Sequence, residues 1–348
     1  MPSLLPVTPE LTARAAHVAE RLAGLPAEVA HLTPAAQRVG VASDFVLDVL
    51  ARFPAELAAR LEDREQLART ALVAHLDLGD ASEAAAMKQL RRIRQIEMAR
   101  IAWRDLAGAA DVDTILAETS LLADCIVEAA AAYAVRQLEP RFPAPRDPAG
   151  KPLPLLVLAM GKLGGGELNF SSDVDLVFLY PHVGVQPETV EAETHYLRVA
   201  QLLIKLLDSN TADGFAYRVD TRLRPFGQSG PLVVSLAAFE AYLLQHGRDW
   251  ERYAYVKARL LTGLPHSADV FDEILTPFVY RRYLDFGVFD ALRQMKRLIS
   301  KEVARKDMAE NIKLGPGGIR EIEFIVQAFQ LVRGGRNPEL RTRSLLAA

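Results

Sequence analysis

Two apolar runs joined by a glycine-rich turn are the feature that most constrains the fold of this chain. The first run is LPLLVLAM (153–160), and the second is VDLVFLY (174–180). Both are short and largely aliphatic, which is typical of buried strands. The turn GKLGGGEL (161–168) follows the first run directly, and an amphipathic helical pattern, ETHYLRVAQLLIKLLDSN (193–210), follows the second. The sequence therefore predicts a small α/β unit in this part of the chain.

Two aspartates stand at the entrance of the second predicted strand, with one residue between them. Asp173 and Asp175 lie in the stretch LNFSSDVDLVFLY. Because side chains alternate between the two faces of a strand, these carboxylates are expected to point the same way. Like charges at this spacing raise each other's pKa and repel unless a cation lies between them. The pair therefore predicts a cation site.

A third aspartate lies in another predicted strand. Asp220 belongs to FAYRVDTRLRP (215–225), which we expect to end at Pro225. Three buried carboxylates without a cation would be very costly, which favours a metal site built from Asp173, Asp175 and Asp220. Oxygen ligands suit a hard ion such as Mg²⁺ or Mn²⁺, and a strand-borne Asp-x-Asp is typical of two-metal phosphoryl-transfer sites. The seven histidines are scattered, so the sequence does not suggest a zinc site.

Arginines alternate with the third aspartate. Arg218, which precedes Asp220, and Arg222 and Arg224, which follow it, recur at a spacing of two, so they are expected on the same face of the strand as Asp220. Arg222 and Arg224 are candidates for clamping phosphate groups. Salt bridges to the aspartates are an equally good interpretation of each arginine.

The glycine-rich turn has two interpretations that the sequence leaves open. Backbone N–H groups in such a turn can approach a phosphate closely. It is not a Walker A loop, because Leu163 follows the Gly-Lys pair where serine or threonine should stand. A simple tight turn after a strand is as good an explanation.

The rest of the chain is predicted to be mainly helical. Residues 1–139 read as a helical region, in which Ser43 is expected to cap one helix and ASEAAAMKQLRRIRQIEMARIAWRDLAG (81–108) forms a long one. Arginines 91, 92 and 94 of that helix could contact phosphates, but a solvated helix face is the favoured interpretation. The proline-rich residues 140–153 predict a linker, 154–234 the α/β core, and 235–348 a second helical region, including a helix over 291–307. The expected fold class is α+β and predominantly helical.

Composition narrows the function classes. The formal net charge of −3 argues against a nucleic-acid-binding protein, which usually carries a basic excess. The single cysteine, Cys125, lies in an alanine-rich helical run and is expected in the core, which fits a cytoplasmic protein. An apolar stretch of about 18 residues is missing, so we expect no membrane-spanning segment. The last residues, RTRSLLAA, carry no helix stop signal, and we expect a longer parent polypeptide.

Four motifs in order carry a resemblance to a known family. They are GKLGGGELNFSSDVDLVFLY (161–180), YRVDTRLRPFGQSG (217–230), RDWERYAYVKAR (248–259) and GPGGIREIEFIVQAFQL (315–331). Together they resemble the bifunctional glutamine synthetase adenylyltransferase/adenylyl-removing enzymes of the DNA-polymerase-β-like nucleotidyltransferase superfamily. The similarity extends from about residue 40 onward. The form NFSSD (169–173) resembles the N-terminal copy of this domain in the family, which removes AMP.

The resemblance implies a reaction and roles for single residues. It implies phosphorolysis of AMP from a tyrosine of glutamine synthetase, with Mg²⁺ or Mn²⁺ held by the three aspartates. It also implies contacts with the substrate or with a phosphate. These contacts involve Gly164, Gly165, Ser172, Arg222, Arg224 and Lys257. For one of these residues, Ser172, a cap at the strand entrance is an equally good explanation.

The implied partners are glutamine synthetase, the PII signalling protein and a C-terminal adenylyltransferase half of the same polypeptide. Adenylylation from ATP by the same fold, or a non-catalytic nucleotide- or regulator-binding module, are the alternatives. The presence of all three aspartates argues against the last of these.

Overall fold

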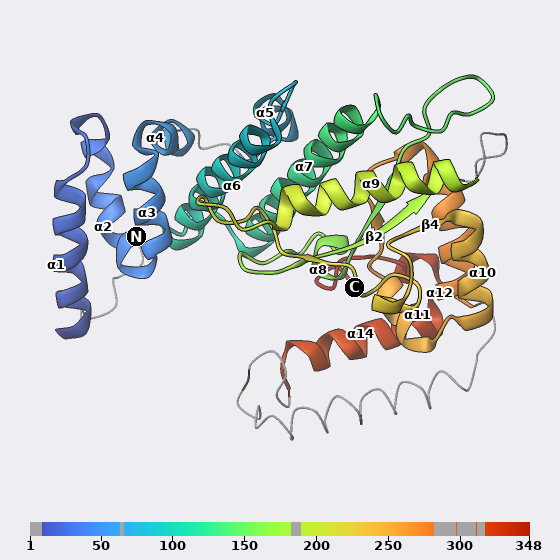
Figure 1. The fold of residues 1–348 in the computed structure, drawn as a ribbon. Coiled ribbons are helices and arrows are strands. Elements are labelled where there is room, and N and C mark those ends of the chain that lie inside the picture. The colour runs from blue at the N-terminus through green and yellow to red at the C-terminus, as the bar shows by residue number, and fades with distance from the viewer. Residues whose placement is uncertain (1–8, 63–65, 182–188, 282–296, 298–310, 312–316) are drawn as a thin grey trace. The chain divides into compact units, whose positions relative to one another are not determined.

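The computed structural model describes residues 9–62, 66–181, 189–281, 297, 311 and 317–348 (Figure 1). The chain divides into two compact units. The first consists of Met1–Ala129 and Ser209–Ala216, and the second of Ala130–Asp208 and Tyr217–Ala348. The fold is α+β and predominantly helical, as predicted. Within the described residues we find no helix that is long and apolar enough to cross a membrane.

The first unit is built from helices. Ser43 and Ser82 cap two of them, because their hydroxyls accept hydrogen bonds from the amides of Val46 and Ala85. The Ser43 cap and the long helix that follows Ser82 were both predicted. The helices are α1 (Pro9–Ala23), η1 (Ala27–Leu32), α2 (Thr33–Ala42), α3 (Asp44–Arg52), α4 (Pro54–Glu62), α5 (Arg69–His75), α6 (Glu83–Leu106) and α7 (Val112–Leu138), the last of which continues into the second unit.

A buried arginine of α6 ties residues 209–216 to the helical unit. The Arg91 side chain is fully buried and donates to the carbonyl oxygens of Ser209 and of Gly214, the latter at 2.7 Å. Gln95 donates to the Asp213 carbonyl at 2.9 Å. The solvated helix face predicted for this arginine run is therefore wrong at Arg91, because its guanidinium is buried and donates to backbone carbonyls of residues 209–216.

The second unit contains a mixed five-stranded sheet. The strands follow the order β3-β2-β1-β5. β4 pairs with the same edge of β2 as β3 does, with β3 at the start of β2 and β4 at its end. β1 is antiparallel to β2 and β5, whereas β3 and β4 run parallel to β2. The strands are β1 (Leu156–Met160), β2 (Val174–Tyr180), β3 (Val219–Asp220), β4 (Val233–Ser235) and β5 (Arg259–Leu260).

Helices accompany the strands in Figure 1. They are α8 (Gly161–Gly164), α9 (Thr189–Asp208), α10 (Leu236–His246), α11 (Asp249–Tyr255), α12 (Thr276–Val279), α14 (Ile319–Arg333), a π-helix (Asp269–Leu275) and short 3-10 turns at Gly227–Ser229, Leu264–His266 and Pro338–Leu340.

Alternation along β2 assigns the two faces of the sheet. Val177 and Leu179 belong to an apolar cluster that also contains Phe239 of α10 and Tyr255 of α11. On the opposite face, Tyr180 stacks on Tyr196 of α9, with ring centroids 4.7 Å apart. Asp175 shares the face of Val177 and Leu179, because residues two apart in a strand point the same way. The carboxylate therefore stands at the end of a buried apolar surface.

Three predictions about elements need correction or lie outside the structure. The strand predicted over 215–225 is only two residues long, and turns follow it up to Pro225. The helical stretch predicted after 235 is interrupted by β5, which completes the sheet edge beside β1. The helix predicted over 291–307 lies outside the described residues except for residue 297. Residues 140–153 contain no helix and belong to the second unit, and their role as a linker stays a prediction.

Candidate functional site

Two of the three aspartates lie side by side at the edge of the sheet. Asp175 is the second residue of β2, and Asp220 is the second residue of β3. The two strands are parallel, and these residues are register partners. Register partners on neighbouring strands project their side chains to the same face. The prediction that a neighbouring strand brings Asp220 beside the Asp-x-Asp pair is therefore confirmed in its geometry.

A glycine that we did not single out from the sequence lies under the carboxylate of Asp175. Met160, the last residue of β1, pairs with Asp175, and the chain turns at Gly161 with φ +55°. A Cβ atom built on Gly161 would overlap the Asp175 Oδ2 atom. Gly161 is thus required twice, for its backbone conformation and for the space that the carboxylate occupies. Its position directly after a strand was the available signal.

Two of the three aspartates, Asp173 and Asp220, are paired with arginines. Arg218 Nε donates to Asp173 Oδ1 at 2.5 Å and also contacts the carbonyl of Ser171. Arg222 donates hydrogen bonds to the carboxylate of Asp220 from its side chain, with Nε 2.8 Å from Oδ2, and from its backbone amide. These hydrogen bonds from Arg222 lower the pKa of Asp220, although partial burial acts in the opposite direction.

The donor set fits a divalent cation, but only two of its carboxylates are prearranged. No group of three or more carboxylate, imidazole or thiolate side chains converges on one point in the residues that the structure describes. Asp173 is held by Arg218 instead, and both partners are about half exposed (50% and 49%). An exposed ion pair of this kind is weak, so it can open at little cost. Asp220 is likewise paired with Arg222, so a cation held by these carboxylates would compete with both arginines.

Arg224 supports a loop of its own. Its guanidinium donates to the carbonyl oxygens of Thr221, Gln228 and Gly230. It therefore braces the turn that follows β3, and its predicted phosphate contact stays a prediction. Arg222, with its side chain 69% exposed, is the better placed of the two arginines for a substrate.

The glycines of the turn pack closely against the backbone of a later segment. A Cβ on Gly164 would overlap the carbonyl oxygen of Lys257, and a Cβ on Gly165 would lie 3.1 Å from the carbonyl oxygen of Arg343. The Gly165 amide donates within the turn, to Gly161 O at 3.1 Å. The structure thus gives both glycines a packing role, and the phosphate contact predicted for them stays a prediction.

Lys257 is buried between two carboxylates. Its ammonium lies 2.6 Å from Glu323 of α14 and 3.5 Å from Glu167, which follows the glycine turn. Glu167 Oε1 also accepts hydrogen bonds from Ser344 Oγ and from the amide of Leu345. Lys257 therefore joins three segments of the unit, and a direct phosphate contact would require it to leave these partners.

Two residues of this cluster were not predicted. Glu167 lies in the turn GKLGGGEL (161–168) and Glu323 in the motif at 315–331, and neither was proposed as a site residue from the sequence. Ser172, the remaining predicted residue, lies just before β2, where its backbone amide donates to Asn169 O at 3.2 Å. It is half-buried beside Asp173. Its predicted contact with a phosphate stays untested.

The chemistry of the site follows from these placements. Two carboxylates in register, a third nearby and two exposed arginines form a surface that can hold a cation together with phosphate oxygens. This combination suits transfer of a phosphoryl or nucleotidyl group, in which charge on the phosphorus oxygens has to be neutralised.

Comparisons with known proteins agree with this chemistry. Residues 35–274 match the family described as Glutamate-ammonia ligase adenylyltransferase. Residues 293–347 match a second family, GlnD PII-uridylyltransferase.

Individual relatives carry one shared name, bifunctional glutamine synthetase adenylyltransferase/adenylyl-removing enzyme. The protein of Shewanella oneidensis is 48% identical over 316 residues, which are 88% of this chain and 33% of that protein. The protein of Thioalkalivibrio sulfidiphilus is 47% identical over 90% of this chain and 33% of that protein. The protein of Stenotrophomonas maltophilia is 47% identical over 99% of this chain and 36% of its own length. The chain thus spans about a third of the length of the curated relatives it matches.

Proposed function

Because this chain belongs to the glutamate-ammonia ligase adenylyltransferase family, we propose that it removes AMP from an adenylylated tyrosine of glutamine synthetase by metal-dependent phosphorolysis. The observation that carries the proposal is the register pair of Asp175 and Asp220 above Gly161. The relatives' shared name includes both addition and removal of the adenylyl group. The NFSSD form of residues 169–173, which resembles the AMP-removing copy, favours removal.

The proposed reaction conserves charge and atoms without an added oxidant or base. An oxygen of orthophosphate attacks the phosphorus of the tyrosine-bound AMP. The bond between phosphorus and the tyrosine oxygen breaks, and the proton of the attacking phosphate passes to that oxygen. The products are ADP and the free tyrosine hydroxyl. Orthophosphate is largely ionised at neutral pH, so the site does not need a strong general base.

The residues of this chain would bind and orient the reactants. Asp175 and Asp220 would hold Mg²⁺ or Mn²⁺, and Asp173 would complete the carboxylate set. The bound cation supplies neutralisation of phosphoryl charge and stabilisation of the leaving phenolate. Once Asp173 turns away, the guanidinium of Arg218 is available to phosphate oxygens, as is that of Arg222. Both of these side chains are at least half exposed.

Lys257, Gly164 and Gly165 have a supporting role in this proposal. Their contacts keep the turn that carries Gly161 packed against the segment after α11. Arg259 adds to this support, because its guanidinium donates to the carbonyl oxygens of Leu163 and Gly164. These contacts hold the turn in place, so that Gly161 stays against the carboxylate of Asp175.

The proposed partners follow from the same comparisons. Glutamine synthetase appears in the relatives' name as the protein acted on, and the relatives are about three times as long as this chain. A C-terminal adenylyltransferase half is therefore part of the proposal. The match of residues 293–347 to a family named for PII uridylylation supports the PII protein as the regulator.

The test is a phosphorolysis assay. The purified chain is incubated with adenylylated glutamine synthetase, Mg²⁺ and orthophosphate, and ADP is measured. We expect ADP that depends on phosphate and disappears in the double variant Asp173→Asn with Asp175→Asn. Glu240→Gln, which neutralises an exposed carboxylate on α10, is the control and should leave the rate unchanged.

Other outcomes decide between the candidates. Transfer of AMP from ATP onto unmodified glutamine synthetase, without phosphorolysis, would assign this chain the addition reaction instead. If a folded chain catalyses neither reaction, either a non-catalytic module or a need for the other half explains the result. Adding the missing part of a relative separates these two cases, because only the second predicts recovery.

A further inference from the structure

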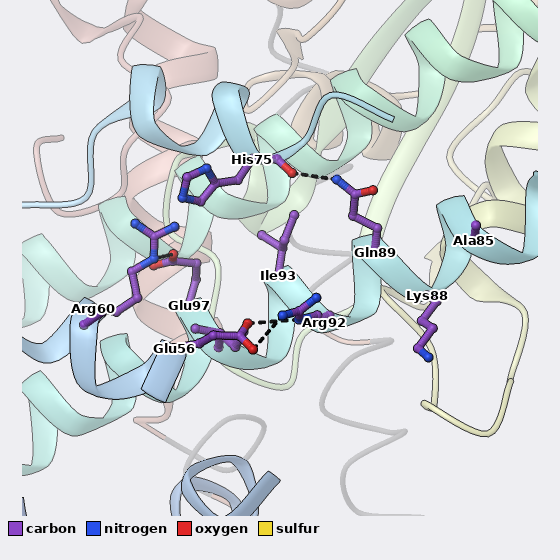
Figure 2. Close-up of a pocket in the computed structure, with 11 residues that line it drawn as sticks. Glu56, Arg60, His75, Ala85, Lys88, Gln89, Arg92, Ile93 and Glu97 are labelled. Carbon is purple, nitrogen blue, oxygen red and sulfur yellow. Dashed lines mark hydrogen bonds and ion pairs between the residues drawn. The ribbon is translucent and has the colours of Figure 1, made fainter. Parts of the chain in front are cut away.

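A pocket in the helical unit lies among side chains that the proposed reaction does not use (Figure 2). Its volume is about 770 Å³, within the range of small-molecule sites, roughly 300–1,000 Å³. It lies between α4, the end of α5 and the first half of α6. The lining residues are Glu56, Ala59, Arg60, His75, Ala85, Lys88, Gln89, Arg92, Ile93, Ile96 and Glu97.

Both carboxylates of the pocket are already neutralised by arginines of the pocket. Arg60 Nε lies 2.9 Å from Glu97, whose side chain is only 2% exposed. Arg92 binds Glu56 in a bidentate manner, with Nη2 at 2.6 Å from Oε1 and Nε at 2.9 Å from Oε2. Both pairs are drawn as dashed lines in Figure 2. Within each pair the charge of the arginine balances the charge of the glutamate.

Lys88 adds a positive charge that these pairs do not balance. It lies four residues before Arg92 on α6, so the two cations share one face of the helix. Among the described residues we find no carboxylate within ion-pair distance of Lys88, whose side chain is exposed at the rim. His75 adds no charge near neutral pH, because burial and the nearby Arg60 lower the pKa of its imidazole. The lining therefore carries one surplus positive charge.

The remaining lining residues are uncharged, and all of them except Gln89 are apolar. Ile93 lies inside the ring of polar side chains in Figure 2, and Ala59, Ala85 and Ile96 complete the apolar wall. An apolar wall with a few converging polar groups at one end is typical of a site for a small organic ligand. A plain helix surface would offer the charges without a hollow lined by Ile93 and Ile96.

We infer that this pocket binds a small organic anion, a carboxylate or a phosphate monoester, with its charged group at Lys88 and Arg92 and its apolar body against Ile93 and Ile96. Arg92 has N–H groups beyond the two that bind Glu56, so it can donate to the ligand without losing that carboxylate. None of the three aspartates of the candidate catalytic site belongs to this unit. The inference does not depend on the proposed reaction.

Calorimetric titration with two simple anions tests this site. The probes are phenyl phosphate and benzoate, with benzyl alcohol as the uncharged control, in metal-free buffer. We expect saturable millimolar binding of at least one anion and much weaker binding of benzyl alcohol. Lys88→Gln should weaken anion binding about tenfold, as expected for the loss of a charge-assisted contact. Ala85→Phe, which places a bulky side chain on the lining, should weaken binding of the anions.

A matched variant and defined outcomes complete the test. Lys151→Gln removes an exposed lysine outside the pocket and should leave the affinity unchanged. Binding of phenyl phosphate alone, or of benzoate alone, supports the site and identifies the anion class. The inference is overturned if neither anion saturates, if benzyl alcohol binds equally well, or if Lys88→Gln binds like the original chain. Circular dichroism of each variant confirms that it is folded.

Discussion

At the scale of single residues, the site depends on a glycine as much as on its carboxylates. Gly161 and Gly166 both have positive φ, +55° and +72°, but only a Cβ on Gly161 would overlap the Asp175 carboxylate. A Cβ on Gly166 meets nothing within 4 Å. Substitutions at the two glycines therefore distinguish the effect of backbone strain, which both share, from displacement of the Asp175 carboxylate, which only Gly161 would cause.

Gly161→Ala should reduce the proposed activity at least tenfold, because it displaces the carboxylate of Asp175. Gly166→Ala should keep most of the activity. Both should lose about 1 kcal/mol of stability from a left-handed non-glycine residue. Initial rates and urea unfolding of the two variants, measured side by side, check this. Equal activity losses would show that strain alone is responsible.

Arg222 should make stability depend on pH through Asp220. The pKa of Asp220 is lowered in the folded state, so the pair stabilises the fold above the usual carboxyl pKa, about 3.9. This contribution is lost as the pH falls through the folded pKa. Arg222→Gln should therefore lower the stability of the fold slightly at pH 7, and not at a pH below both pKa values.

Urea unfolding of the original chain and of Arg222→Gln across this pH range, in metal-free buffer, measures the difference. Arg222 is exposed, so the difference at pH 7 should also shrink at high salt. A difference that stays constant from pH 7 to acid conditions would mean that Arg222 acts through packing and not through the charge of Asp220.

At the scale of elements, the sequence predicts best where a local pattern decides the structure. The strands at β1 and β2, the cap at Ser43 and the long α6 follow from apolar runs, spacing and capping residues. β5 was missed because two residues, Arg259 and Leu260, become a strand only by pairing with β1. The burial of Arg91 was missed for the same reason, since its partners lie more than 100 residues away.

The same limits apply to the candidate site. The meeting of Asp175 and Asp220 could be anticipated from two short apolar strands, one with acids at its entrance and one that contains Asp220. Sequence alone did not say which arginine pairs with which aspartate, because that depends on the register of β3 against β2. Nor did it reveal the contact of Glu167 with the segment at Ser344.

The contact between α6 and residues 209–216 should contribute strongly to the stability of the helical unit. Arg91→Met removes a buried donor to the carbonyls of Ser209 and Gly214, of which Gly214 still accepts from Thr211, and this should cost about 3 kcal/mol. Arg92→Met alters the neighbouring, half-exposed arginine and should cost about 1 kcal/mol or less. Hydrogen exchange should accelerate in residues 209–216 only in the first variant. Equal effects of both substitutions would contradict this assignment.

At the scale of the whole molecule, the helical unit is discontinuous in sequence. Eight residues, Ser209–Ala216, come from the connection between α9 and β3. The strand that carries Asp220 begins three residues after Ala216. The stability of the helical unit is therefore linked through the chain to the segment that leads into the candidate catalytic site.

This discontinuity predicts that one substitution has opposite consequences in two lengths of the chain. A fragment that ends at Leu138 keeps α1 to α7 but lacks the carbonyls of Ser209 and Gly214. Arg91 then lacks these two acceptors and the segment that packs on it, so its favourable contacts with residues 209–216 are lost. Arg91→Met should cost about 3 kcal/mol in the full chain, yet be neutral or stabilising in the fragment.

Urea unfolding of the fragment and hydrogen exchange of α6 in the full chain measure the two values. Arg92→Met should cost the same in both, because Glu56 is present in both. A similar cost of Arg91→Met in both lengths would show that Arg91 stabilises α6 through contacts within residues 9–138 alone.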